Sequence, residues 1–177
     1  MNAIATDSDC RLLSQGTAST SYGGVLGWKI HNADHHFEEA RTGNKPSLYS
    51  PPFYVGRHGY KMCAKVYLNG DGVGKSSHVS VFLVLMRGEF DALLAWPFRQ
   101  KVTLTLLDQS PGKCHISCPF LPDASSSSFQ RPSLEMNIAS GCPRFVSIDT
   151  VRIANEYVKE NSMILRVAID RIGLSTY

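Results

Sequence analysis

The chain has 177 residues, 43% of them hydrophobic and 19% charged, and a formal net charge of +3; these values suit a single soluble globular domain with a short extension. A net charge this small argues against binding to nucleic acid or to an anionic membrane surface. The longest apolar run, residues 79–86, is far shorter than the roughly 20 residues of a membrane span, and the N-terminus has no secretory pattern, so we expect a non-secreted protein.

Residues 1–22 are predicted to be an extension of the domain that occupies residues 23–177. They are rich in Ser, Thr, Asp and Ala and lack the repeated apolar heptads of a coiled coil. Residues 24–30 are predicted to form a short apolar strand in which Trp28 anchors the core. A short helix is predicted over residues 35–43, where helix-forming residues end at a glycine.

Three strands with one apolar face are predicted after a proline-rich edge segment at residues 45–54. Apolar side chains occupy every second position in Tyr60–Leu68, in Val79–Leu85 and in Lys101–Leu107. A period of two residues is typical of a strand with one face in the core. In the second strand the odd positions form the aliphatic face, so Phe82 is predicted to lie outside the core.

The connection at residues 69–76 is rich in glycine and shares part of the phosphate-binding loop motif. Gly74-Lys75-Ser76 matches the end of that motif, but Asn69 stands where the motif requires glycine. A helix should also follow, whereas the next segment is predicted to be a strand. We therefore interpret the glycines as a β-hairpin connection that requires positive φ angles.

No periodicity is visible from residue 110 to residue 132, and a long loop is predicted there. It contains four serines, Ser125–Ser128. The aromatic residues Phe120 and Phe129 are expected to tie its ends to the domain.

Strands are again predicted at residues 145–148 and 163–170. In total the sequence predicts seven or eight strands and one short helix, without the alternation of strands and helices that a parallel sheet requires. The predicted fold is all-β, an antiparallel β-sandwich.

The cysteines are odd in number in a chain large enough to need no cross-links, so free thiols are expected. They are Cys10, Cys63, Cys114, Cys118 and Cys142. A zinc site built from Cys114, His115 and Cys118 with Cys142 is the alternative. Structural zinc usually has two paired sets of ligands, and only one loose set is present, so we predict no metal site.

Catalytic motifs are missing from the sequence. It contains no G-x-S-x-G or H-E-x-x-H pattern and no cysteine with an identifiable orienting group, so no enzyme and no catalytic residue are predicted.

The outer face of the predicted sheet carries an unusual combination of side chains. If the first two amphipathic strands are neighbours, then Lys65, Tyr67, Ser80 and Phe82 share this face. A cation, a phenol and a phenyl ring together can bind an extended peptide. The alternative is that the long loop covers these side chains and packs on them.

Four separate runs of the chain resemble the carboxy-terminal domain of the tumour necrosis factor receptor-associated factors. They are GYKMCAKVYLNGDG, FDALLAWPFRQKVTLTLLDQ, SSSSFQRP and MNIASGCPRF. The resemblance extends from residue 24 to about residue 174, and it is greatest to the members that share a triple-serine loop. It is specific because the four motifs occur in order.

The resemblance implies an eight-stranded antiparallel sandwich of the meprin-and-TRAF-homology type, a cytoplasmic location and no cofactor. Members form trimers on a coiled-coil stalk, of which residues 1–22 would be a remnant. Each domain binds a receptor tail of the tumour necrosis factor receptor superfamily, or a related adaptor protein, through a Pro-x-Gln-x-Thr or similar motif that adds a strand.

The resemblance also assigns peptide-binding roles by position. Hydroxyl groups would hold the glutamine of the motif, and these belong to Ser126, Ser127 and Ser128. Lys65 and Tyr67 would bind the acidic residue that follows it, and Asp71 would lie at the far end of the groove. The pocket for the first, small residue would be formed by Phe82, Phe120, Phe129, Ser140 and Gly141.

Several of these roles agree with simple chemistry, because serine hydroxyls both donate and accept hydrogen bonds and a cation with a phenol suits a carboxylate. Two departures from the family pattern stand out. Lys65 replaces the usual arginine, which keeps the charge but loses the planar fork. The loop at residues 110–119 is about one residue longer, and Leu121 stands where an arginine is frequent.

The sequence therefore predicts a cytoplasmic adaptor domain. The alternatives are a domain of the same fold that serves as an assembly module, or the substrate-recruiting part of a larger ubiquitin ligase. Ligase activity itself would need an upstream zinc-bound RING, whose paired ligands are not found here.

Overall fold

The computed structural model describes residues 20–154 and 156–174. The predicted N-terminal extension lies almost wholly outside these residues, as does Cys10.

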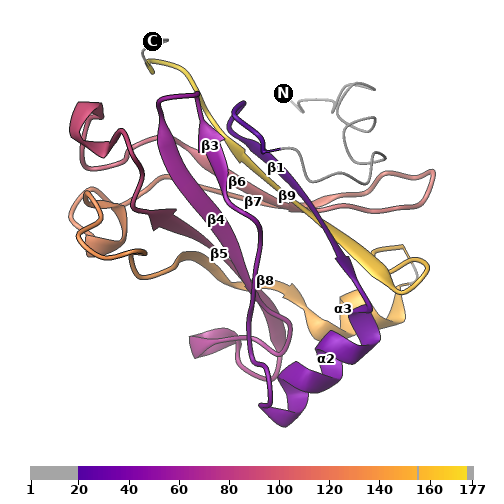
Figure 1. Ribbon diagram of the computed structural model, residues 1–177. Helices are drawn as coiled ribbons and strands as arrows, with labels where there is room; N and C mark the ends of the chain where they lie inside the picture. The colour runs from indigo at the N-terminus through magenta and orange to yellow at the C-terminus, as the bar shows by residue number, and fades with distance from the viewer. Residues whose placement is uncertain (1–19, 155, 175–177) are drawn as a thin grey trace.

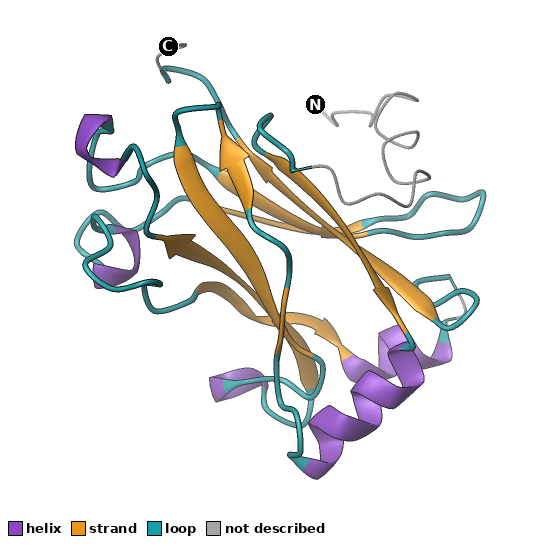
Figure 2. Ribbon diagram, viewed as in Figure 1, coloured by secondary structure: helices purple, strands orange, loops and turns teal. Residues whose placement is uncertain are grey.

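Two antiparallel sheets pack face to face (Figures 1 and 2). One sheet has the order β1-β9-β6-β7, formed by Val25–His31, Ser162–Ile169, Val102–Leu106 and Ile116–Phe120. The other has the order β2-β4-β5-β8, formed by Leu48–Tyr49, Tyr60–Tyr67, His78–Met86 and Ser140–Ser147. A short strand, β3 (Phe53–Val55), also pairs with β4. The predicted antiparallel β-sandwich is confirmed.

The edge segment predicted at residues 45–54 forms two short strands, β2 and β3. Pro51 and Pro52 stand between them, and proline cannot donate a hydrogen bond to a neighbouring strand. With these two short strands counted separately, the described residues form nine strands.

The core lies between the two sheets and follows the predicted alternation. In β4 the even residues are buried, and in β5 the odd residues Val79, Val81, Leu83 and Leu85 all belong to the core. Two further buried phenylalanines, Phe53 at the start of β3 and Phe98 in the segment before β6, complete the packing with side chains of β6 and β9. Trp28 is only half-buried and packs against the rim of this core.

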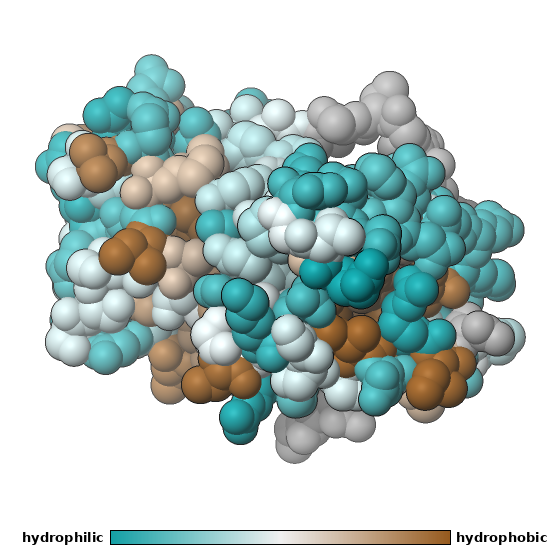
Figure 3. Space-filling model, turned by 90° about the horizontal axis from the view of Figure 1, so that it is seen from below, coloured by the Kyte–Doolittle hydropathy of each residue, from teal (hydrophilic) through white to brown (hydrophobic). Residues whose placement is uncertain are grey.

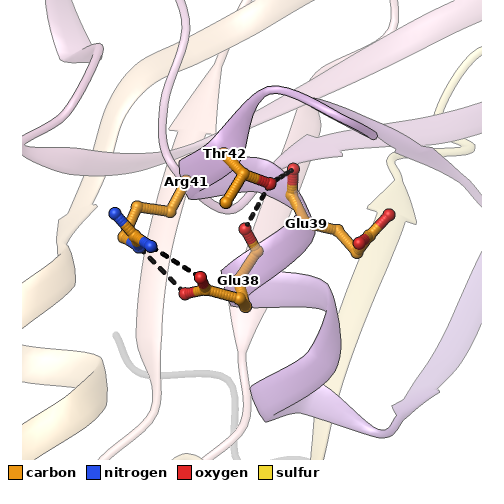
Figure 4. A network of polar contacts seen from close by, with 4 residues as sticks. All are labelled: Glu38, Glu39, Arg41 and Thr42. Atoms are coloured by element: carbon orange, nitrogen blue, oxygen red, sulfur yellow. Dashed lines mark hydrogen bonds and ion pairs between the residues drawn. The ribbon is translucent and has the colours of Figure 1, made fainter.

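Helix α2 (Ala33–Thr42) covers one end of the sandwich and ends, as predicted, at Gly43. Gly43 has φ +80°, which glycine adopts readily, and its N–H donates to the carbonyl of Ala40. The exposed side of the last turn holds an Arg41–Glu38 ion pair and a Thr42 hydroxyl that donates to helix carbonyls (Figure 4). These contacts are exposed to solvent, so they contribute little to the stability of the helix.

A second helix, α3 (Ile148–Ile153), was not predicted. It has only six residues, too few to show a helical period, and it begins where the Ser147 hydroxyl accepts a hydrogen bond from the N–H of Thr150 at 3.1 Å. The end of the molecule that carries both helices is largely hydrophilic, with small separate hydrophobic patches (Figure 3). No helix within residues 20–154 and 156–174 has the length and hydrophobicity needed to cross a membrane.

The glycine-rich connection joins β4 and β5 as a hairpin, as predicted. A short 3-10 helix, η1 (Gly72–Gly74), lies at its tip. Gly70 has φ +73°, and a side chain there would meet the carbonyl oxygen of Gly74 at 2.2 Å, so only glycine fits. The strand β5 follows, in place of the helix that a phosphate-binding loop requires.

The prediction of an unbroken loop at residues 110–132 is wrong, because β7 lies within it. β7 pairs with β6 along its whole length and forms an edge of its sheet. Its inner side is only half-buried, and Pro119 is the fourth of its five residues, so the strand has neither a strong apolar face nor a full set of donors.

The prediction that the cysteines are free is wrong for two of them. Cys118 of β7 and Cys142 of β8 form a disulfide. Each strand ends the order of its own sheet, so the cross-link joins the two layers at one side of the sandwich. Residues 24 apart were brought together by sheet packing, which spacing in the sequence does not reveal. Cys63 is buried and free, and Cys114 is exposed and free.

Candidate functional site

An open groove of about 320 Å³ lies on the outer face of the five-stranded sheet, away from the core. Strands β2, β4 and β5, the connection between β4 and β5, and the segment that precedes β8 contribute its lining. The lining residues are Tyr49, Lys65, Tyr67, Asp71, Phe82, Val84, Met136, Asn137, Ile138 and Ala139. Four of the predicted peptide-binding residues therefore meet in one groove: Lys65, Tyr67, Asp71 and Phe82.

Strand register places the first of these side chains. Lys65 lies opposite Phe82 and Tyr67 lies opposite Ser80 in the β4–β5 pair, so all four side chains point to the outer side of the sheet, although Ser80 is buried there. The rings of Tyr67 and Phe82 meet edge to face with centroids 5.8 Å apart. Phe82 is only 8% exposed, and it lies outside the core cluster of the described residues. The prediction that it is not part of the core is correct, but its neighbours on the outer face cover most of it.

Lys65 is the cation of the groove. Its Nζ lies 4.9 Å from the ring centroid of Tyr49 and 4.9 Å from that of Tyr67. Partial burial lowers the pKa of Lys65, but interactions with the hydroxyl groups of Tyr49 and Tyr67 raise it by more, so the pKa lies above its ordinary value. Lys65 is therefore positively charged at neutral pH.

Asp71 is placed by a buried serine. The Ser80 hydroxyl is fully buried and not part of the outer surface, contrary to prediction. It accepts a hydrogen bond from the N–H of Asp71 at 2.9 Å and donates one to the carbonyl of Pro143 at 2.6 Å. These two bonds fix the hairpin against β8, and the exposed Asp71 carboxylate lines the groove.

The predicted serine cluster does not line this groove, but it lies beside it. Ser127 is exposed, Ser126 is half-buried and Ser128 is buried. The Ser126 hydroxyl accepts a hydrogen bond from the N–H of Ser128 at 3.2 Å and so caps the short helix η3 (Ser127–Phe129). This helix contacts β5, close to the end of that strand (Figure 1).

Asn137 connects the serine loop to the groove, of which it is itself a lining residue. Its side-chain amide donates to the carbonyls of Ser128 at 3.1 Å and Gln130 at 2.8 Å. Its backbone N–H donates to the carbonyl of Leu85 in β5 at 2.9 Å. One residue thus holds the loop and the sheet in a fixed relation.

Phe120 and Phe129 pack in or against the core and do not line the groove. Phe129 is 2% exposed and belongs to the core, where its ring centroid lies 6.4 Å from that of Phe98. Phe120 lies 6.5 Å from Phe129 and packs against the same core. As predicted, these aromatic residues tie down the serine loop.

Ser140 and Gly141 begin β8 and are half-buried. Gly141 lies opposite Phe82. A Cβ at this position would meet the carbonyl oxygen of Val81 at 2.6 Å and the Cα of Phe82 at 2.9 Å. Glycine is therefore needed here because β8 approaches β5 so closely.

Several lining residues were not predicted. Met136 and Ile138 are exposed by 38% and 74%, and they alternate with half-buried neighbours along the segment before β8. That alternation was a visible sequence pattern, although the segment was not predicted to be extended. Tyr49 stands between two prolines in a two-residue strand, too short for any period to show.

The arrangement suits the binding of an extended chain. It offers one cation, one carboxylate, phenol groups and apolar surface in a shallow depression. Within the described parts of the chain, no group of three or more His, Cys, Asp or Glu side chains could hold a metal ion.

The sequence and the fold both match known proteins. Residues 45–166 match the family described as TRAF/meprin, MATH domain. The chain is 55% identical to TNF receptor-associated factor 5 of Mus musculus over 154 residues, which are 86% of this chain and 28% of that protein. It is 48% identical to TNF receptor-associated factor 2 of Homo sapiens over 156 residues, 88% of this chain and 31% of that protein.

A solved structure named Notothenia coriiceps TRAF5 superimposes on this fold with a TM-score of 0.85 and 46% sequence identity. The match covers 89% of this chain and 78% of that chain. The chain spans less than a third of each of the two factors above. With most of its length matched by the family model and its fold matched at high identity, the chain belongs to the TRAF/meprin MATH domain family.

Proposed function

We propose that this chain is an adaptor domain that binds a short extended peptide from a receptor tail in the groove on the five-stranded sheet. The observation that carries the proposal is the groove itself, which holds a charged lysine close to two aromatic rings, in a sheet that ends in an edge strand. An extended peptide needs free backbone groups to pair with and pockets for alternate side chains.

The edge strand is β8. It is last in the order of its sheet and pairs with β5 on one side. Its other side pairs with no strand in the described residues, so a peptide could add there. None of the loop residues 110–132 lines the groove, so the outer face is open, which favours a ligand over a covering loop.

The side chains suit a motif of the Pro-x-Gln-x-Thr type. Lys65 and Tyr67 would bind an acidic residue that follows the glutamine, because an ammonium and a phenol both donate to a carboxylate. The exposed Ser127 and half-buried Ser126 hydroxyls would hold the glutamine carboxamide. The Ser128 hydroxyl would join them only if the buried residue turned toward the ligand.

The wider role is inferred from the relatives' names. Those relatives are TNF receptor-associated factors, and we infer that the partners here are tails of the tumour necrosis factor receptor superfamily or related adaptor proteins. The protein would act in the cytoplasm as a homotrimer without catalytic activity in this domain. Each subunit would bind weakly, in the micromolar to millimolar range, and trimer avidity would supply the rest.

Calorimetric titration with a Pro-x-Gln-Glu-Thr peptide, in which the acidic residue follows the glutamine, tests the proposal. Lys65→Ala or Tyr67→Ala should lower the affinity about tenfold or more, the loss expected when a hydrogen bond to a charged group is removed. Lys61→Ala is the matched control, because Lys61 lies on the same face of the same strand and does not line the groove. Equal affinity in all four proteins would contradict the assignment of the site.

A further inference from the structure

Tyr49 places a second aromatic ring close to the ammonium of Lys65, in addition to the ring of Tyr67. Tyr49 lies directly across from Lys65 in the β2–β4 pair, and Tyr67 is two residues further along β4 on the same face. The ammonium is equally distant from both ring centroids, at 4.9 Å. A cation at this distance from a ring face is attracted by it, so two rings hold Lys65 in one place.

The backbone of Tyr49 is itself fixed. The next residue, Ser50, is buried and bonds twice to Ala64 of β4. Its N–H donates to the Ala64 carbonyl at 2.9 Å, and its hydroxyl accepts from the Ala64 N–H at 2.8 Å. The two-residue strand is therefore anchored beside the groove although it is short.

The charge of Lys65 is not matched within the described residues, because none of the three ion pairs found there includes it. The nearby Asp71 also lines the groove but makes no such pair. A fixed and unmatched cation in a groove suits an anionic group of a ligand. The Tyr49 and Tyr67 hydroxyls add two hydrogen-bond donors near the ammonium.

Fixing the ammonium matters because lysine lacks the planar fork of arginine and has a flexible stem. A free lysine must lose rotamer freedom when it binds a ligand, and that loss weakens binding. Rings that already hold the side chain in place remove this cost before the ligand arrives.

We propose that Tyr49 is a positioning residue that sets the preference of the groove for a carboxylate side chain. This inference rests on the peptide-binding function proposed above, and it assigns to Tyr49 a part of the charge recognition. Tyr49 is 48% exposed at the groove, so it can be changed without opening the core.

The test compares two peptides, one containing Pro-Val-Gln-Glu-Thr and one containing Pro-Val-Gln-Gln-Thr. The unchanged protein should bind the first about tenfold more tightly. Tyr49→Leu keeps an apolar side chain but removes the ring, and it should reduce this preference to about threefold or less while binding of the second peptide stays the same. Tyr49→Phe keeps the ring and should retain more of the preference than Tyr49→Leu.

The matched control is Tyr22→Leu. Tyr22 is 42% exposed and also lies under a cation, with Cζ of Arg57 at 5.7 Å from its ring, but it is not part of the groove. Its replacement should leave both affinities unchanged. A parallel loss of both peptides with Tyr49→Leu, or no change in either, would overturn the proposal.

A measurement without peptide separates this inference from the proposed function. The rings should shift the Nζ-adjacent methylene protons of Lys65 upfield in the NMR spectrum of the free protein, and Tyr49→Leu should reduce that shift. If the unchanged protein binds neither peptide, the proposed function fails and the carboxylate role of Tyr49 fails with it. An unaltered shift in Tyr49→Leu would refute the positioning of Lys65, whatever the peptides do.

Discussion

Removing the disulfide between Cys118 and Cys142 should lower the stability of the purified, oxidised protein by a calculable amount. The cross-link joins residues 24 apart, and the loss of chain entropy for a loop of this size corresponds to about 3.5 kcal/mol at 25 °C. Part of this is offset in practice, so we expect a loss of about 2–4 kcal/mol in the double variant Cys118→Ala/Cys142→Ala. For a domain of this size the melting temperature should fall by about 5–15 °C.

Urea unfolding followed by tryptophan fluorescence measures this difference. The unchanged protein should be destabilised by a dithiol reductant to the level of the double variant, whereas the double variant should not respond. Cys114→Ala is the matched control, because it removes an exposed free thiol and leaves the cross-link intact. If the oxidised protein and the double variant unfold at the same urea concentration, the cross-link does not restrain the unfolded chain as we infer.

Three further predictions concern the five-stranded sheet. Gly141→Ala should lower the free energy of unfolding in urea by about 1–3 kcal/mol, because the added Cβ would lie 2.6 Å from a carbonyl oxygen of β5. Gly23→Ala is the control and should cost much less, because a Cβ there would have nothing within 4 Å. Equal costs would contradict the close approach of the strands. Burial raises the pKa of Cys63 to about 11, nearby lysines lowering it by less, so iodoacetamide at pH 8 should modify Cys114 and leave Cys63 intact in the native protein. Rapid labelling of Cys63 at pH 8 would show that the site is open. Because the folded state holds the Cys63 proton more tightly than the unfolded state, the contribution of this thiol to the free energy of unfolding should be constant below about pH 9 and should be lost as the pH rises toward 11.

The strands that carry the groove could be predicted because their pattern is strong. β4 and β5 are long enough for several cycles of alternation, and their hairpin glycines fix the register between them. That register brings Lys65 and Phe82 together, so the centre of the candidate site followed from the sequence alone.

What could not be predicted depends on contacts between segments that are distant in the chain. The burial of Phe129 in the core is decided by packing against Phe98, and the disulfide is decided by the meeting of two sheet edges. The role proposed for Tyr49 depends on its pairing with Lys65, and this pairing could not be predicted because a strand of two residues is too short to show a sequence pattern. Short elements such as α3 depend on a single cap and have no periodicity to detect.

The hydrogen bonds of Asn137 bear on which spacing of polar side chains a peptide ligand must have. Its side-chain amide holds the serine loop and its backbone holds β5, so the two surfaces belong to one rigid frame. A ligand that touched the serine loop with one residue and Lys65 with another would have to span a set distance along its own backbone. The groove would then bind only motifs with the right number of residues between their polar side chains, and it would not bind motifs in which this spacing is one residue longer or shorter.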